Sequence, residues 1–179
     1  MTSLQVRRLT YAALYLAIAM VLPFITGQIP EIGAALSPMH IPALLCGFMC
    51  GWPWGMAVGF IAPILASAAA VMPQPLVPNA LAMSLEMAVY GGMAGWLRRR
   101  LPRTRPAIYA VLIISMIAGR IVWGAARVVL AGLTGSTFTW ALFLGGAVTN
   151  AIPGIILHIV LIPILVAIME QAGLSLNRD

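Results

Sequence analysis

Ionisable and amide side chains interrupt the apolar runs of this sequence at a few separate places. An ionisable residue in the core of a lipid bilayer costs about 2.5–3.5 kcal/mol on insertion scales, so such residues mark functional sites by default. Together these groups supply hydrogen-bond donors, a carboxylate and two amides, the mixture that binds a small polar solute in an otherwise apolar pocket. They are His40, Asn79, Glu86, Arg120, Arg127, Asn150 and His158.

Two of the apolar runs carry most of these groups, each on one helical face. Residues spaced by three, four or seven positions share a face of an α-helix. One such face holds Arg120, Trp123 and Arg127, and a face of the preceding run holds Asn79, Glu86 and Tyr90. We expect Glu86 to accept hydrogen bonds from a ligand, the arginines to donate them, and the two aromatic rings to stack on it.

A purely structural alternative is an ion pair between Glu86 and one arginine that joins two helices. That interpretation leaves a second arginine without a counter-charge. An unpaired arginine is costly in lipid unless a ligand, water or backbone carbonyls satisfy it. The sequence leaves both interpretations open.

The chain that must position these groups is an all-α integral membrane protein. Of its 179 residues, 62% are hydrophobic and 8% are charged, against about 25% charged residues in soluble domains. No segment shows the alternation of apolar and polar residues that a membrane barrel strand requires. A spanning helix needs about 20 mostly apolar residues, so we predict one transmembrane domain over residues 1–179 with six spans. The predicted spans are 9–25, 40–51, 54–71, 79–97, 107–130 and 140–169.

Arginines set the expected orientation of these spans. The chain has a net charge of +6, and most arginines lie just before the first span or in one short loop, Arg98–Arg105. Basic flanks face the cytoplasm and contact anionic lipid. Six crossings then place both termini and every basic loop on the cytoplasmic side. We expect membrane lipid and not nucleic acid as the partner of these residues, because no nucleic-acid-binding motif accompanies them.

The depth of the polar groups follows from the same spans. A helix rises about 1.5 Å per residue, which places His40 at the outer mouth. By this count His158 lies about 27 Å from the outer surface, near the cytoplasmic side, so we assign it to packing. Four other groups fall in the outer half of the membrane at overlapping depths: Glu86, Arg120, Arg127 and Asn150.

The stretch His40–Gly55 raises the question of a metal or redox site, because Cys46 and Cys50 share one helical face. Two thiols do not complete a zinc site, which usually has four ligands, and cysteines four apart in a helix are poorly oriented for a disulfide. We therefore expect them to pack as small apolar side chains. No catalytic motif occurs, so we predict no enzymatic activity, no metal and no cofactor.

Small residues recur at four-residue spacing in four of the spans. Such pairs let helix backbones approach closely in lipid, where the hydrophobic effect does not drive association. We expect most of them to pack inside the bundle. The pairs are Ala13 and Ala17, Gly47 and Gly51, Gly55 and Gly59, and Gly91 and Gly95.

The chain resembles the S-components, the substrate-capture subunits of energy-coupling factor (ECF) transporters. The resemblance covers nearly the whole chain and implies a six-helix S-component fold in a bacterial cell membrane. It also implies capture of a water-soluble vitamin or a related heterocyclic micronutrient from outside. The segments that carry it are Leu36–Phe48, Glu86–Tyr90, Arg120–Gly124 and Asn150–Gly154.

The resemblance implies partners as well. S-components dock on a membrane coupling subunit and two ATPase subunits through small residues of the first span, and Ala13 and Ala17 match that Ala-x-x-x-Ala pattern. Their substrate binds between the outer halves of spans four to six. Two alternatives remain open. One is a stand-alone secondary carrier for a small polar solute, although no internal inverted repeat supports it. The other is a structural membrane subunit without a ligand.

Overall fold

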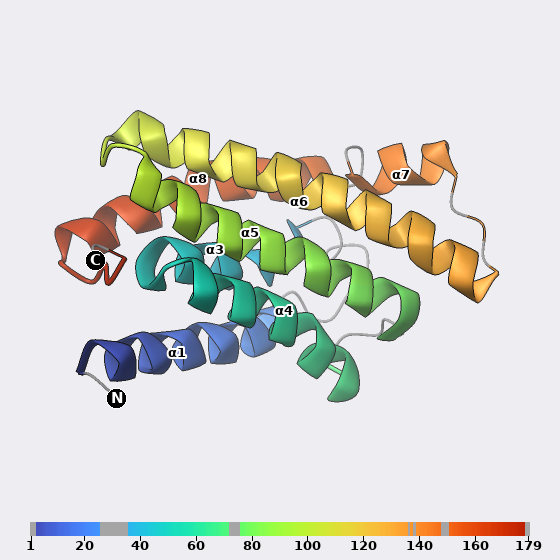
Figure 1. Cartoon of the computed structure of the whole chain (residues 1–179), viewed down its shortest axis with the longest axis horizontal. Coiled ribbons are helices and arrows are strands. Elements are labelled where there is room, and N and C mark those ends of the chain that lie inside the picture. Colours follow the sequence, from blue (N-terminus) through green and yellow to red (C-terminus); the bar gives the residue numbers. More distant parts are fainter. Residues whose placement is uncertain are drawn as a thin grey trace.

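The described part of the chain folds into helices in a computed structural model (Figure 1). The structure describes residues 3–25, 36–71, 76–135, 137, 139–147 and 151–177, and no strand occurs among them. A wide helical turn, η1 (Leu76–Ala80), leads into the helix that begins at Leu81. The helices are α1 (Ser3–Ile25), α3 (His40–Cys50), α4 (Trp52–Ala68), α5 (Leu81–Arg100), α6 (Arg105–Thr134), α7 (Trp140–Ala147) and α8 (Ile152–Gln171).

The lengths and surfaces of the helices suit a lipid bilayer. Within the described residues, α1, α6 and α8 are each long and apolar enough to cross a membrane, whereas α3 and α4 are shorter apolar helices. Isoleucine and valine side chains point outward from α6 and α8, for example Ile117, Val128 and Ile156. A surface of this kind is stable against lipid and not against water. The all-α membrane class is confirmed, and the six crossings stay a prediction.

The last predicted span is wrong as a single helix. The structure divides residues 140–169 into α7 and α8, and α8 begins at Ile152 with Pro153 in its first turn. Proline suits that position because the N–H it lacks has no partner inside the helix. Hydropathy alone does not show the break, because Thr149 and Asn150 are the only polar residues near it and two residues are too few to end the apolar run.

Glycines hold the centre of the bundle together, where α3, α4 and α5 meet. A Cβ atom on Gly91 of α5 would collide with the backbone carbonyl of Gly55 on α4, and one on Gly55 would lie 2.5 Å from Cα of Gly47 on α3. The three backbones therefore touch at positions where only hydrogen replaces a side chain. The predicted role of these glycines in packing inside the bundle is confirmed.

The two cysteines lie in the main apolar core. Cys46 and Cys50 are free thiols, both are buried, and they pack in one cluster with Phe48, Val111 and Ile162. A buried thiol among apolar neighbours behaves as a small hydrophobic side chain. The predicted packing role of the two cysteines is confirmed.

One end of the bundle collects both ends of the described chain and the turn between α5 and α6 (Figure 1). There Arg98 donates two hydrogen bonds to the carboxylate of Glu170, with N···O distances of 2.9 and 2.6 Å, and only 1% of Arg98 is exposed. The expectation that this arginine contacts lipid is wrong, because the last turns of α5 and α8 meet there and bury its guanidinium. A buried guanidinium needs a counter-charge, and Glu170 supplies it.

Candidate functional site

The carboxylate of Glu86 is the centre of a buried polar cluster in which α3, α5 and α6 meet. Only 2% of Glu86 is exposed. The Tyr90 hydroxyl donates to Oε1 at 2.8 Å, and a terminal guanidinium nitrogen of Arg120 lies 3.1 Å from the same oxygen. Nε2 of His40 lies 3.8 Å from Oε2. A buried carboxylate is stable only when it is paired and hydrogen-bonded, and these contacts meet that requirement.

The first turn of α3 fixes the His40 ring. Its backbone N–H donates to the Ser37 carbonyl at 3.1 Å, and ring atom Nδ1 lies 3.1 Å from the same oxygen. Because a carbonyl can only accept, Nδ1 carries a proton. The other ring nitrogen, Nε2, therefore faces Glu86.

A glycine of α6 fixes the Tyr90 ring. A Cβ atom on Gly119 would overlap the Tyr90 ring atoms, so the aromatic ring fills the space that this glycine leaves. The helical spacing of four residues then carries the hydroxyl to Glu86 on the same face of α5. Gly119 directly precedes Arg120, so the same turn of α6 seats the tyrosine and supplies the guanidinium.

The placement of His158 corrects the depth estimate. Its ring centre lies 6.0 Å from that of His40, and the residue is buried. The estimate counted residues from Trp140 as if 140–169 were one helix. Since α8 begins at Ile152, His158 lies about 9 Å along that helix and reaches the same level as His40. No pattern in the sequence indicates that the two histidines are neighbours, because their proximity depends on the break between α7 and α8.

A second polar contact joins η1 to α6. A terminal nitrogen of the Arg127 guanidinium donates to Oδ1 of Asn79. This contact joins the two polar faces that the sequence places on neighbouring helices. Asn150, the remaining amide of the predicted site, lies outside the described residues.

Aromatic rings from α6 and α7 stack next to this polar cluster. The Trp123 and Phe143 ring centres are 6.1 Å apart, and those of Trp140 and Phe143 are 5.1 Å apart. The guanidinium carbon of Arg120 lies 5.9 Å from the Trp123 ring centre, within range of a cation–π interaction.

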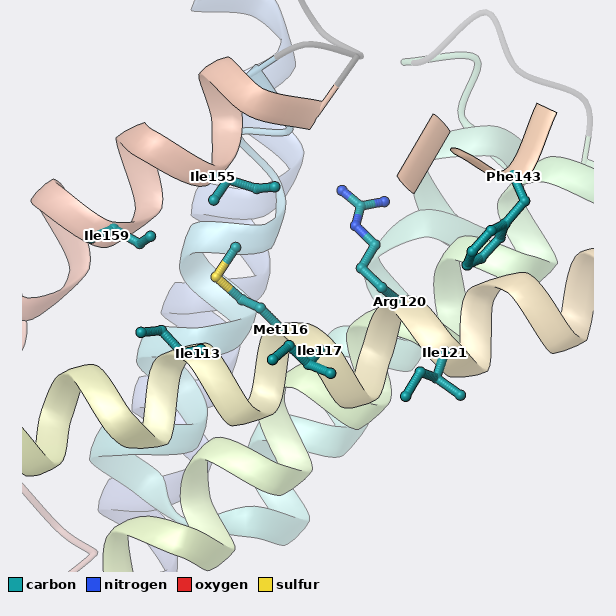
Figure 2. Close-up of a pocket in the computed structure, with 8 residues that line it drawn as sticks. All are labelled: Ile113, Met116, Ile117, Arg120, Ile121, Phe143, Ile155 and Ile159. Atoms are coloured by element: carbon teal, nitrogen blue, oxygen red, sulfur yellow. The ribbon is translucent and has the colours of Figure 1, made fainter. Parts of the chain in front are cut away.

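A cavity of about 300 Å³ opens between α6, α7 and α8. Figure 2 shows the Arg120 side chain rising from α6 into the space between α8 and α7. Among the predicted site residues that the structure describes, Arg120 is the one that lines this cavity, and Glu86, Tyr90 and His40 are not part of its wall. The lining residues are Ile113, Met116, Ile117, Arg120, Ile121, Phe143, Ile155 and Ile159.

The apolar walls of this cavity have no distinguishing pattern in the sequence. Ile113, Ile117 and Ile121 follow each other at four-residue spacing on α6, a pattern that is identical for a cavity wall and for a lipid-facing helix surface. Phe143 lies on α7, whose separation from α8 was not predicted. Only the packing of α7 and α8 against α6 distinguishes a wall from an outer surface.

The family model of the ECF transporter substrate-specific component matches residues 7–166. The chain belongs to this family. No curated protein and no solved structure matches it.

As an ECF S-component, the protein is a subunit of a transporter and not an enzyme. The family match runs from the first turns of α1 to Val166 in α8 and so includes every helix that contributes to the Glu86 cluster and to the cavity. In the described residues of this S-component, no group of three or more His, Cys, Asp or Glu side chains could hold a metal ion.

Proposed function

We propose that this S-component captures a water-soluble vitamin or a related heterocyclic micronutrient from outside the cell, at the cavity beside Arg120. The observation that carries the proposal is the guanidinium of Arg120, which contacts the buried Glu86 on one side and lines the cavity on the other. A group with this placement connects a rigid polar core to a space that a small molecule can fill. Apolar walls with a few fixed polar groups are typical of ligand sites.

The proposed binding residues share this region of the bundle. Glu86, which Tyr90 and His40 contact in turn, holds Arg120 in position. Trp123 offers a ring for stacking, and the contact between Arg127 and Asn79 lies further along α6. Asn150 completes the proposed set. ATP-driven import would require a membrane coupling subunit and two ATPase subunits of the ECF type, since no nucleotide-binding motif occurs in this chain. The bacterial cell membrane is the location that these partners imply.

A thermal-shift screen of the purified protein against vitamins and their precursors tests the proposal. A ligand at 100 times its Kd stabilises the folded state by about 2.7 kcal/mol, which raises the melting temperature by several degrees. Arg120→Ala and Glu86→Ala should abolish the shift, and Arg105→Ala, an exposed arginine at the other end of α6, should retain it. Arg120→Ala leaves the buried Glu86 carboxylate without its cation, which can disturb the fold. Glu86→Gln removes that charge with little change of shape and serves as the milder variant. Unchanged binding in all variants would show that the ligand does not bind at the Glu86–Arg120 cluster.

Uptake assays separate this function from the alternatives. An S-component requires its ATPase partners, whereas a stand-alone carrier would take up substrate in vesicles that contain only this chain and an ion gradient. A structural subunit without a ligand would show no stabilisation by any solute in the screen.

A further inference from the structure

The cavity beside Arg120 has an unusual distribution of polarity. Among the described residues that line it, Arg120 is the one whose side chain carries a charge or a hydrogen-bonding nitrogen or oxygen, and the others are isoleucines, a methionine and a phenylalanine. Figure 2 shows these side chains arranged along both sides of the Arg120 guanidinium. The described part of the wall is therefore apolar except at one point, and that point is cationic.

The Arg120 guanidinium keeps donors available for a ligand. An arginine has five N–H donors in a fixed plane, and Glu86 takes one terminal nitrogen at 3.1 Å. Nε of Arg120 is buried and has no hydrogen-bond partner among the described residues. The planar fork of a guanidinium fits a carboxylate with two parallel hydrogen bonds. An acceptor that enters the cavity would therefore meet a donor that the folded chain leaves unsatisfied.

From these observations we infer that the captured molecule is a small amphipathic anion. Its apolar body fills the space between α6 and α8, and its single carboxylate, or a comparable anionic group, binds Arg120. This inference rests on the proposed function and narrows it, since a vitamin-like molecule with many polar groups would not fit the same wall.

Size and polarity both support this class. A volume of about 300 Å³ is at the lower end of the range of ligand pockets, so the ligand is small. A hydroxyl or amide group placed against the isoleucines would lose its hydrogen bonds to water without replacement. A cationic group would be repelled by Arg120. An apolar body with one anionic end has neither penalty.

A lipid acyl chain is the competing occupant, because Ile117 and Ile121 are more than half exposed and face the surroundings of the bundle as well as the cavity. An acyl chain, however, brings no acceptor to the buried Nε of Arg120. Charge complementarity therefore favours an anion, and the two occupants differ in how strongly they depend on this arginine.

Three probes with the same apolar body test the charge requirement: 4-phenylbutyrate, its isosteric amide 4-phenylbutyramide, and the cationic 4-phenylbutylamine. Binding to the full-length protein in phosphatidylcholine nanodiscs is measured by isothermal titration calorimetry. We expect the acid to bind about tenfold more tightly than the amide, as hydrogen bonds to a charged group predict, and the amine not to bind. Equal binding of acid and amide would overturn the inference.

Two variants test the place of binding. Arg120→Met combined with Glu86→Gln removes both charges, so no lone buried charge remains, and it should abolish the preference for the acid. Ile117→Trp should block the cavity with little effect on the fold, because the side chain is partly exposed. Arg105→Met is the matched control and should bind like the unmodified protein. Acid binding that survives in the first two variants would identify partition into the nanodisc or its lipid, and would overturn the inference.

A failure of this inference can be distinguished from a failure of the proposed function. Binding of a polar or cationic vitamin without binding of the apolar acid would overturn the amphipathic anion and leave vitamin capture in place. If neither the probes nor any vitamin or precursor binds, both proposals fail.

Discussion

Among single residues, Glu86 has the central position because side chains of three helices meet at its carboxylate. Tyr90 and Arg120 both contact Oε1, and His40 approaches Oε2. The hydrogen bond from Tyr90 and the charge of Arg120 reduce the cost of keeping the carboxylate away from water. The site and the stability of the bundle are therefore coupled, since the contacts that orient Arg120 also stabilise the packing of α3, α5 and α6.

Tyr90→Phe tests this coupling at the level of one hydrogen bond. The variant keeps the ring beside Gly119 and removes the hydroxyl that donates to Glu86 at 2.8 Å. A hydrogen bond to a charged group contributes about 1.5–3 kcal/mol, so the free energy of unfolding should fall by that amount. Unfolding in mixed micelles of SDS and maltoside measures it. Tyr109→Phe, at an exposed position of α6, is the control and should change little. Equal stability of both variants would show that the Glu86 cluster does not stabilise the fold.

Some of these residue contacts could be predicted from the sequence and others could not. Helical spacing was sufficient to place Glu86 with Tyr90, and Arg120 with Trp123, because a helix fixes which residues share a face. The proximity of His158 to His40 could not be predicted, because it requires knowing where α8 begins. The burial of Arg98 was missed for a related reason. Its partner, Glu170, is distant in the sequence and lies on another helix.

At the level of helices, the glycine contacts between α3, α4 and α5 decide how closely the bundle packs. Gly47, Gly55 and Gly91 place three backbones in direct contact. The sequence predicted such contacts from four-residue spacing, since small pairs of this kind pack helices in lipid. It could not say which helices would pair, because all the small pairs obey the same rule.

Gly91→Ala tests the close approach of α5 and α4. The added methyl group would collide with the carbonyl of Gly55, and overpacking of this kind typically costs about 1–3 kcal/mol. We expect a lower melting temperature of the detergent-solubilised protein. Gly132→Ala is the matched control, because a Cβ atom there meets nothing within 4 Å, and it should melt at or slightly above the temperature of the unmodified protein. Equal melting of the two variants would contradict the close contact.

At the level of the whole molecule, the arginines and the helix directions agree on one orientation. Both ends of the described chain and the α5–α6 turn lie at the same end of the bundle, and the turn after α6 lies at the opposite end (Figure 1). By the positive-inside rule, we expect the end that carries Arg8, Arg98 and Arg103 to face the cytoplasm. This expectation needs the sequence alone, since it depends on charge counts in loops and not on side-chain contacts.

Labelling in intact cells tests this orientation. Thr137→Cys places a thiol after α6, and Thr104→Cys places one before it, both at exposed positions. A maleimide that does not cross the membrane should label the first variant only. The native Cys46 and Cys50 are buried, so the unmodified protein should remain unlabelled and provides the background. Labelling of Thr104→Cys alone would invert the orientation and move the Arg120 cavity away from the outer face.

We propose that the surface of α1 is where a coupling subunit docks. Ala13 and Ala17 are exposed, whereas Ala12, Tyr15 and Ala19 of the same helix are buried against the bundle. The small residues therefore leave a shallow strip on the outside of α1, where a helix of a coupling subunit could approach closely, as small residues permit in lipid. Packing inside the chain does not require them to be small.

Ala13→Trp tests whether this strip serves coupling. A bulky ring there should block close approach of a partner helix and leave the distant Glu86 cluster unchanged. We expect normal ligand binding by the isolated protein and loss of uptake in cells that also contain the coupling and ATPase subunits. Ala110→Trp, at an exposed position of α6, controls for the effect of an extra ring on insertion and should keep uptake. If Ala13→Trp transports normally, coupling uses another face. If it loses binding as well, the ring disturbs the fold, and Ala17→Leu, a smaller change on the same strip, decides the question by the same two measurements.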